Sequence, residues 1–325
     1  MVHIRSLVKA GQTSHTVSLP KEWLDKNNLK RGDLIYLHEN GEKELLITPH
    51  LLKDTPQELK EITISIDKKE IDTIQREITS AYINNYHLIN IAGENLSEHL
   101  KDIRNIIQDF VALEVVEQTN KRIVVKDLLN LDDIAIDKTI KRMDMVVRSM
   151  LQDSKGSVEK PELDESIRFR DEDVNRIYFI LFRLLKSALK NPKIAEKFGL
   201  SNDKLLSTWY LAVNVENVAD CCKNISTLLK KANNAEQVQR TSLTKSLGRK
   251  DETELASSTL KELEKSYLDV MKSYYNKDKI LADSVAKQRI GLLKQIDKLP
   301  QQYSESFKLM TTLLGNVARI VLDEE

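Results

Sequence analysis

Apolar residues recur at helical spacing from Leu131 to the C-terminal end of the chain. The stripe Ile136, Ile140, Met143, Val147 and Met150 advances by four, three, four and three residues, which predicts a helix with one packing face. Similar stripes begin at Ile167, Leu211, Ala256, Ile280 and Tyr303. They predict an internal repeat of two antiparallel three-helix bundles, over residues 133–232 and 252–325. Residues 231–251 lose the pattern and indicate either a polar linker or the frayed end of a long helix.

A different pattern occupies residues 58–128, where short alternating and helical segments follow one another. Ile62, Ile64 and Ile66 alternate with polar residues and predict a strand, whereas Ile71, Ile74, Ile78 and Tyr82 recur at helical spacing. Continued to Lys126, the order β-α-β-α-β-β predicts a small α/β sandwich that links or dimerises other parts. Its isolated polar residues are expected on the surface; they are Asp67, Glu94 and His99.

Residues 1–50 indicate short strands and one helical turn. Strands are expected over 2–9, 16–19, 34–39 and 45–48, with the last two flanking the hairpin signal Asn40-Gly41. Pro20 suits the first turn of a short helix, and Gly32 suits a turn. Because so few apolar residues cannot enclose a core, a second copy is expected to complete this domain. The fold class is therefore multidomain α+β.

Composition supports this division. Lysine plus arginine and aspartate plus glutamate are equal at 50 each, and charged residues make up 31% of the chain. This balance favours long solvated helices. No apolar run approaches the length of a membrane span, and Arg5 and Lys9 interrupt any apolar leader, so a cytoplasmic protein without membrane insertion is expected. Cys221 and Cys222 are the only cysteines, and at least Cys222 is expected to be a small core residue.

Basic residues gather at the N-terminus of this otherwise neutral chain. Six basic residues precede Gly32 and only two acidic ones, Glu22 and Asp25. A basic β-rich surface suits the phosphate backbone of DNA. The alternative is a solvated edge that discourages strand pairing.

The same stretch resembles the SpoVT/AbrB family of swapped-hairpin DNA-binding domains. The matching segments are the loop 9–14, Val17-Ser18-Leu19-Pro20-Lys21-Glu22-Trp23, and Leu29-Lys30-Arg31-Gly32-Asp33. The resemblance implies an interlaced homodimer that lays basic loops and strands on double-stranded DNA. The DNA-contacting candidates that it implies are Arg5, Lys9, Gln12, Thr13, Ser14 and His15. This loop contains fewer glycine and arginine residues than is usual in the family.

Acidic residues occur in pairs on two of the predicted helices. Glu216 and Asp220 are four residues apart and lie opposite the apolar stripe of their helix. Asp171 and Asn175 flank the stripe of the preceding long helix. Carboxylates at this spacing can share a hard or borderline cation. The alternative is a solvated acidic face.

These pairs resemble the acidic motifs of PhoU proteins. That resemblance implies two tandem three-helix bundles with metal clusters on their surface, and the ligands that it implies here are Asp171, Asn175, Glu216 and Asp220, holding iron or zinc. Asn175 stands where aspartate is usual. The second bundle lacks the acids, so its metal site is expected to be lost; the residues at those places are Arg289, Ile290, Leu293, Thr312 and Asn316.

Over its full length the chain resembles archaeal phosphate uptake regulators that fuse the two families. This implies a DNA-binding transcription regulator of phosphate homeostasis, with the bundles as the sensor. The alternative is an adaptor that does not bind DNA and that restrains a phosphate transporter or its signalling kinase. No enzyme is expected, because the chain has no phosphate-binding glycine loop, and all six histidines lie outside the bundles.

Overall fold

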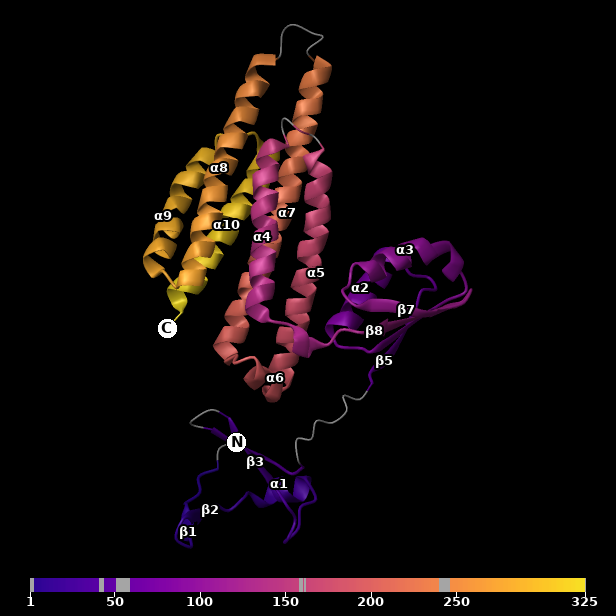
Figure 1. Ribbon diagram of the computed structural model, residues 1–325, viewed down its shortest axis with the longest axis vertical. Helices are drawn as coiled ribbons and strands as arrows, with labels where there is room; N and C mark the ends of the chain where they lie inside the picture. The colour runs from indigo at the N-terminus through magenta and orange to yellow at the C-terminus, as the bar shows by residue number, and fades with distance from the viewer. Residues whose placement is uncertain are drawn as a thin grey trace. The chain divides into compact units, whose positions relative to one another are not determined.

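The computed structural model describes residues 3–40, 44–50, 59–157, 160, 162–239 and 246–324 (Figure 1). The chain divides into two compact units, Met1–Leu59 and Lys60–Glu325. Each unit is described separately.

The N-terminal unit consists of two antiparallel hairpins and one short helix. Strands β1 (Val8–Ala10) and β2 (Ser14–Thr16) form the first hairpin, and β3 (Tyr36–Asn40) and β4 (Glu44–Thr48) form the second. The strand expected from Val2 begins only at Val8, and the one expected over 16–19 ends at Thr16. The turn predicted at Asn40-Gly41 lies outside the described residues.

Helix α1 (Lys21–Lys26) begins directly after Pro20, as the sequence predicts. A β-turn follows it, in which the amide of Asp33 donates to the carbonyl of Lys30 at 3.1 Å. Gly32 occupies the third position with φ of 98°, a backbone conformation that favours glycine. A second hydrogen bond closes the same turn, in which the amide of Lys30 donates to the carboxylate of Asp33 at 2.6 Å.

The N-terminal unit has no core of its own within the part of it that is described. No described side chain from residue 3 to residue 50 is buried. Leu34, Leu37 and Leu45 are 75%, 57% and 56% exposed. Exposed apolar groups at this density are typical of an interface, so the described part of the unit does not form a core by itself.

The second unit opens with a four-stranded sheet covered on one face by two helices. The sheet order is β5-β6-β8-β7, with β5 parallel to β6 and the other pairs antiparallel. All six elements match the predicted order β-α-β-α-β-β. Their bounds are β5 Glu61–Ser65, α2 Ile71–Ile83, β6 Leu88–Ala92, α3 Leu96–Gln108, β7 Leu113–Gln118 and β8 Arg122–Asp127.

Long helices make up the rest of this unit and lie alongside one another (Figure 1). The first set contains α4 (Ile136–Gly156), α5 (Leu163–Lys190) and α7 (Asn202–Gln239). The second set contains α8 (Ser246–Asn276), α9 (Lys279–Ile296) and α10 (Gln301–Asp323). Thus α7 and α8 extend into the segment 231–251, which favours the frayed-helix alternative over a linker.

One short helix was not predicted. Helix α6 (Pro192–Lys197) lies between α5 and α7. The side chain of Asn191 accepts a hydrogen bond from the amide of Lys193 at 3.1 Å and caps this helix. Pro192 stands at the first helical position, where its missing N–H is not needed.

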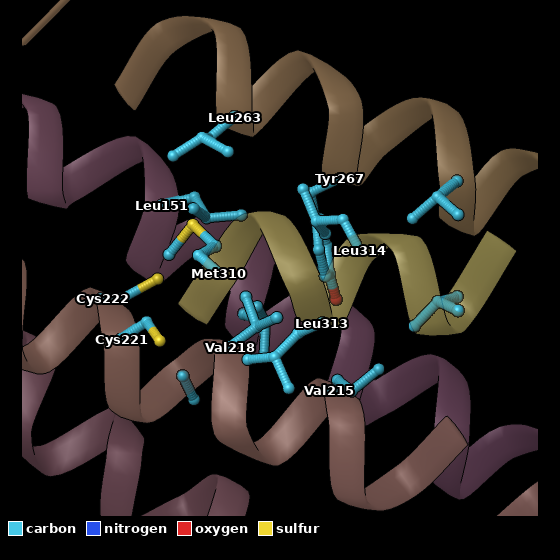
Figure 2. Packing of buried hydrophobic residues seen from close by; sticks show 14 of the residues in the cluster. Leu151, Val215, Val218, Cys221, Cys222, Leu263, Tyr267, Met310, Leu313 and Leu314 are labelled. Carbon is cyan, nitrogen blue, oxygen red and sulfur yellow. The ribbon is translucent and has the colours of Figure 1, made fainter. Parts of the chain in front are cut away.

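The two helix sets share a single apolar core. Residues of all six long helices belong to one buried cluster. Figure 2 shows Leu151 of α4, Val218 of α7 and Leu263 of α8 pointing toward Met310 of α10. Cys221 and Cys222 are buried beside this core, which confirms the prediction for Cys222. The helices were predicted correctly as elements, and their packing joins the sets.

The α/β part is fixed to helix α5 by a buried polar network. The guanidinium of Arg183 forms an ion pair with Asp127 at the end of β8, and both side chains are at most 3% exposed. Its Nε also donates to Asn85, and its carbon lies 4.7 Å from the ring centroid of Tyr82. Asn85 in turn donates to the hydroxyl of Ser187 at 2.7 Å. Helix α2 and the end of β8 are therefore attached to the same helix that carries Asp171.

No helix in the described residues is long and apolar enough to span a membrane.

Candidate nucleic-acid interface and acidic cluster

The first hairpin presents most of the predicted DNA-contacting residues together. Lys9 and His15 are directly opposite each other across β1 and β2, so their side chains lie on the same face. Gln12 and Thr13 form the turn, and Gly11 enters it with φ of 85°. All of these side chains are exposed. The hairpin therefore offers a cation, an imidazole and polar groups to a partner.

Two further predicted contacts differ in their surroundings. The hydroxyl of Ser14 donates to the carbonyl of Ala10 across the hairpin, so it stabilises the turn. Arg5 lies in the extended segment before β1, exposed, and its guanidinium donates to the carbonyl of Ile4 at 3.0 Å. Both cations, Arg5 and Lys9, are thus free of carboxylate partners within the described residues.

Residues 14–53 match a family model described as antidote-toxin recognition MazE, bacterial antitoxin. This is a MazE/AbrB-type domain. The match supports the swapped-hairpin part of the sequence resemblance and covers the second hairpin, α1 and the turn at Gly32. Searches of curated proteins and of solved structures gave no match to the chain. Domains of the MazE/AbrB type typically dimerise and bind DNA, which agrees with the exposed apolar groups of the N-terminal unit.

The predicted acidic residues lie outside the MazE-type domain, and three of them come together between α5 and α7. The ammonium of Lys223 lies 2.5 Å from Oδ2 of Asp171 and 2.6 Å from Oδ1 of Asp220. Glu216 lies close enough for both carboxylates to affect its pKa. Asp171 is buried, and its Oδ1 accepts no hydrogen bond from the described chain. Asn175 is half-buried and joins none of these contacts.

Glu216 and Asp220 lie on the side of α7 opposite its main apolar stripe, as expected, but this side is only partly exposed, and the helix packing explains why. Helix α7 contacts α4, α5 and α10, so the side opposite its main apolar stripe is covered by α5. Glu216 and Asp220 are consequently half-buried. Lys223, which was not predicted from the sequence, is the ion-pair partner of Asp220 and of Asp171.

A heptad pattern explains how α5 and α7 bring these residues together. The residues of α5 that face α7 recur every seven positions, as do those of α7 in the opposite direction. On α5, Asp164 accepts a hydrogen bond from Lys230 of α7 at 3.3 Å, and Asp171 accepts one from Lys223. The next two pairs along the helices are Tyr178 of α5 with Glu216 of α7, and Leu185 with Trp209. Antiparallel helices with heptad spacing form a coiled-coil seam. The acids of α5 are therefore seam positions with lysine partners.

Glu216 lies on α7, and its partner on α5 in this seam is Tyr178 rather than a lysine. Burial, Asp220 and Asp171 raise the pKa of Glu216 from 4.5 to about 7. The unfolded chain releases this proton at lower pH than the folded protein, so the free energy of unfolding is expected to fall as pH rises through this window. The full shift corresponds to about 3 kcal/mol, which solvent screening of a partly exposed group reduces to about 1–2 kcal/mol.

Glu216→Gln is expected to remove this loss of stability. Urea unfolding above about pH 8 should then show the variant to be more stable than the wild type, and near pH 4.5 the two should agree. Glu165→Gln, at an exposed carboxyl of α5, is the control and should follow the wild type. An unchanged pH dependence in Glu216→Gln would contradict this account.

The second helix set carries no comparable cluster among its described residues. Asn316 of α10 donates to Asn214 of α7 at 2.9 Å, and the hydroxyl of Thr312 donates to the carbonyl of Lys308 at 3.0 Å. Asn316 therefore helps to join the two sets.

The acidic cluster does not fit a metal ion as its residues stand. Its oxygens suit a hard cation, but the ammonium of Lys223 already occupies the point on which Asp171 and Asp220 converge. Within the described chain, no three His, Cys, Asp or Glu residues are arranged to hold a metal. Iron or zinc at this cluster stays a prediction, which elemental analysis of the purified protein tests.

Three polar residues that seemed isolated in the sequence meet at one hollow. Asp67, Glu94 and His99 line a depression of about 470 Å³ at the ends of β5 and β6. Oδ1 of Asp67 accepts from the amide of Glu94 at 2.9 Å, and Glu94 pairs with Lys121 at 2.6 Å. Through these contacts the carboxylates of Asp67 and Glu94 stabilise the turns in which they lie.

Proposed function

We propose that this chain is a DNA-binding transcription regulator that grips duplex DNA as a homodimer through its MazE-type domain. The observation that carries this proposal is the match of residues 14–53 to a MazE-type model. The exposed hairpin with Lys9 and the basic excess before Gly32 support it, because duplex DNA attracts cations along its backbone. The unburied apolar side chains of the domain support the dimer.

The helical unit is proposed as the sensor or partner-binding part. Its helix α5 carries both the charged seam toward α7 and the Arg183 network toward the sheet. A change of packing at the seam would therefore reach the α/β part through one helix. The resemblance to PhoU proteins makes phosphate status the proposed signal.

Two other functions remain as distinct proposals. The matching family model is described by toxin recognition, so an antitoxin-type regulator would bind a protein partner as well as DNA. An adaptor for a phosphate transporter or kinase would use the N-terminal unit only to dimerise. Sequencing of the DNA fragments that co-purify with the protein separates the adaptor from the two DNA-binding regulators, since an adaptor would retain none.

Charge removal at Arg5 and Lys9 is expected to weaken DNA binding and flatten its salt dependence. Each lost phosphate contact should lower the slope of log K against log salt by about 0.9, so Arg5→Gln/Lys9→Gln should lower it by nearly 2. Fluorescence anisotropy between about 50 and 200 mM salt, on a duplex recovered with the protein, measures both effects.

The control replaces two exposed lysines of the second unit, Lys101→Gln/Lys138→Gln, which should leave the slope unchanged. Light scattering should show that both variants keep the oligomeric mass of the wild type. Equal affinity and slope in the Arg5/Lys9 variant would place the DNA-contacting surface elsewhere.

A further inference from the structure

The α5–α7 cluster contains a cation supplied by the chain itself. Two carboxylates from different helices, Asp171 and Asp220, share the ammonium of Lys223 at 2.5 and 2.6 Å. The lysine is partly buried, with 27% of its side chain exposed, so its position is defined by packing.

The backbone keeps this ammonium in place. Lys223 belongs to the heptad series of α7, and Lys230 makes the equivalent contact to Asp164 one heptad further along. A lysine at either position reaches the acid of α5 without any change in the helices. The cluster is thus built by the same spacing that packs α5 against α7.

We propose that Lys223 is the resident cation of this cluster, standing where the PhoU resemblance implies a metal ion, and that its removal opens a site for a hard divalent cation. A metal entering the native cluster would have to displace the ammonium from both carboxylates. The displaced lysine would then lose its partners while remaining near a second positive charge.

Asp171 shows what the vacated site would offer. Its Oδ1 is buried and accepts no hydrogen bond from the described chain, and its Oδ2 would be released by loss of Lys223. Asp220 and the nearby Glu216 could add carboxylate oxygens only by moving toward Asp171, since the three are not arranged to hold a metal in the described chain. An all-oxygen set without histidine or thiolate favours Mn²⁺, Mg²⁺ or Ca²⁺ over zinc.

The test compares the full-length wild type, Lys223→Gln and the matched control Lys230→Gln. Titration with Mn²⁺, followed by loss of the free-ion electron paramagnetic resonance signal, is expected to show no binding below about 1 mM in the wild type and control. Lys223→Gln should bind at least about tenfold more tightly than the wild type. Adding Asp171→Asn to this variant should abolish the gain.

Two results would overturn the proposal. One is stoichiometric metal in the wild type that is lost on Asp171→Asn, since the native cluster would then hold a metal beside Lys223. The other is a folded Lys223→Gln, checked by circular dichroism, that binds Mn²⁺ no better than the wild type. If the glutamine variant does not fold, Lys223→Met, which keeps an apolar stem, gives the same comparison.

Discussion

Replacement of Arg183 by alanine is expected to destabilise the second unit by about 3–5 kcal/mol, because it leaves a carboxylate buried without its counter-ion. Asp127 is 2% exposed at its side chain and has Arg183 as its ion-pair partner. The same change removes the donor to Asn85 and the cation over Tyr82. Urea unfolding, followed by circular dichroism, measures the loss as a lower midpoint.

Two controls separate the ion pair from a general effect of charge removal. Arg176→Ala breaks a partly exposed pair with Asp173, 3.6 Å apart, and should cost less than about 1 kcal/mol. The double replacement Arg183→Met/Asp127→Leu removes both charges and should recover much of the stability lost in Arg183→Ala. A midpoint for Arg183→Ala close to that of the wild type would mean that this network does not fix the sheet to α5.

Arg183 was not singled out from the sequence, although the signal is present there. It is the only charged residue within Leu181-Phe182-Arg183-Leu184-Leu185, and a charge in an apolar run points to a buried partner. The identity of that partner could not be predicted. Asp127 lies 56 residues earlier, in another element, and periodicity gives no information about contacts at that range.

The elements of the α/β part were predictable because each follows its own local rule. Ile62, Ile64 and Ile66 alternate, and Ile74 and Ile78 keep helical spacing; apart from the partly buried Ile62, all are buried in one cluster. The strand order was not predictable, since β8 inserts between β6 and β7 through long-range pairing. In the N-terminal unit, Val17 was predicted in a strand but lies just beyond β2 and is 45% exposed.

The sequence predicts which acidic residues of α5 and α7 meet, but it does not predict that Lys223 pairs with them. The pairing of Asp171 with Glu216 and Asp220 follows from their helices, but the main apolar stripe of each helix does not show that a second face is also buried. The seam appears only when the seven-residue spacings of α5 and α7 are aligned in antiparallel order, which places Lys223 against Asp171. A central helix such as α7 has more than one buried face, so the side opposite one stripe is not necessarily solvated.

Replacement of Leu37 by glutamate is expected to separate the N-terminal dimer. Leu37 is 57% exposed within the described chain and is the cross-strand neighbour of Ile47. In a monomer, a charge at such an exposed position changes stability by less than about 0.5 kcal/mol. In the proposed dimer the same position would be covered, and an unpaired buried carboxylate there should raise the dissociation constant by at least about 30-fold, equivalent to about 2 kcal/mol.

The matched control is Leu206→Glu, at a leucine of α7 that is 64% exposed and lies outside the MazE-type domain. Light scattering over a range of protein concentrations should give a smaller mass for Leu37→Glu than for the control at each dilution. DNA affinity should fall together with the mass, because two hairpins of a dimer contact more phosphates than one. If Leu37→Glu keeps the mass of the wild type, either the exposed leucines of this domain are not its dimer interface or another part of the chain holds the copies together.

The same measurement on Leu45→Glu, in the neighbouring strand β4, gives a second check of the interface. If both leucines belong to one dimer interface, both variants should show the same loss of mass.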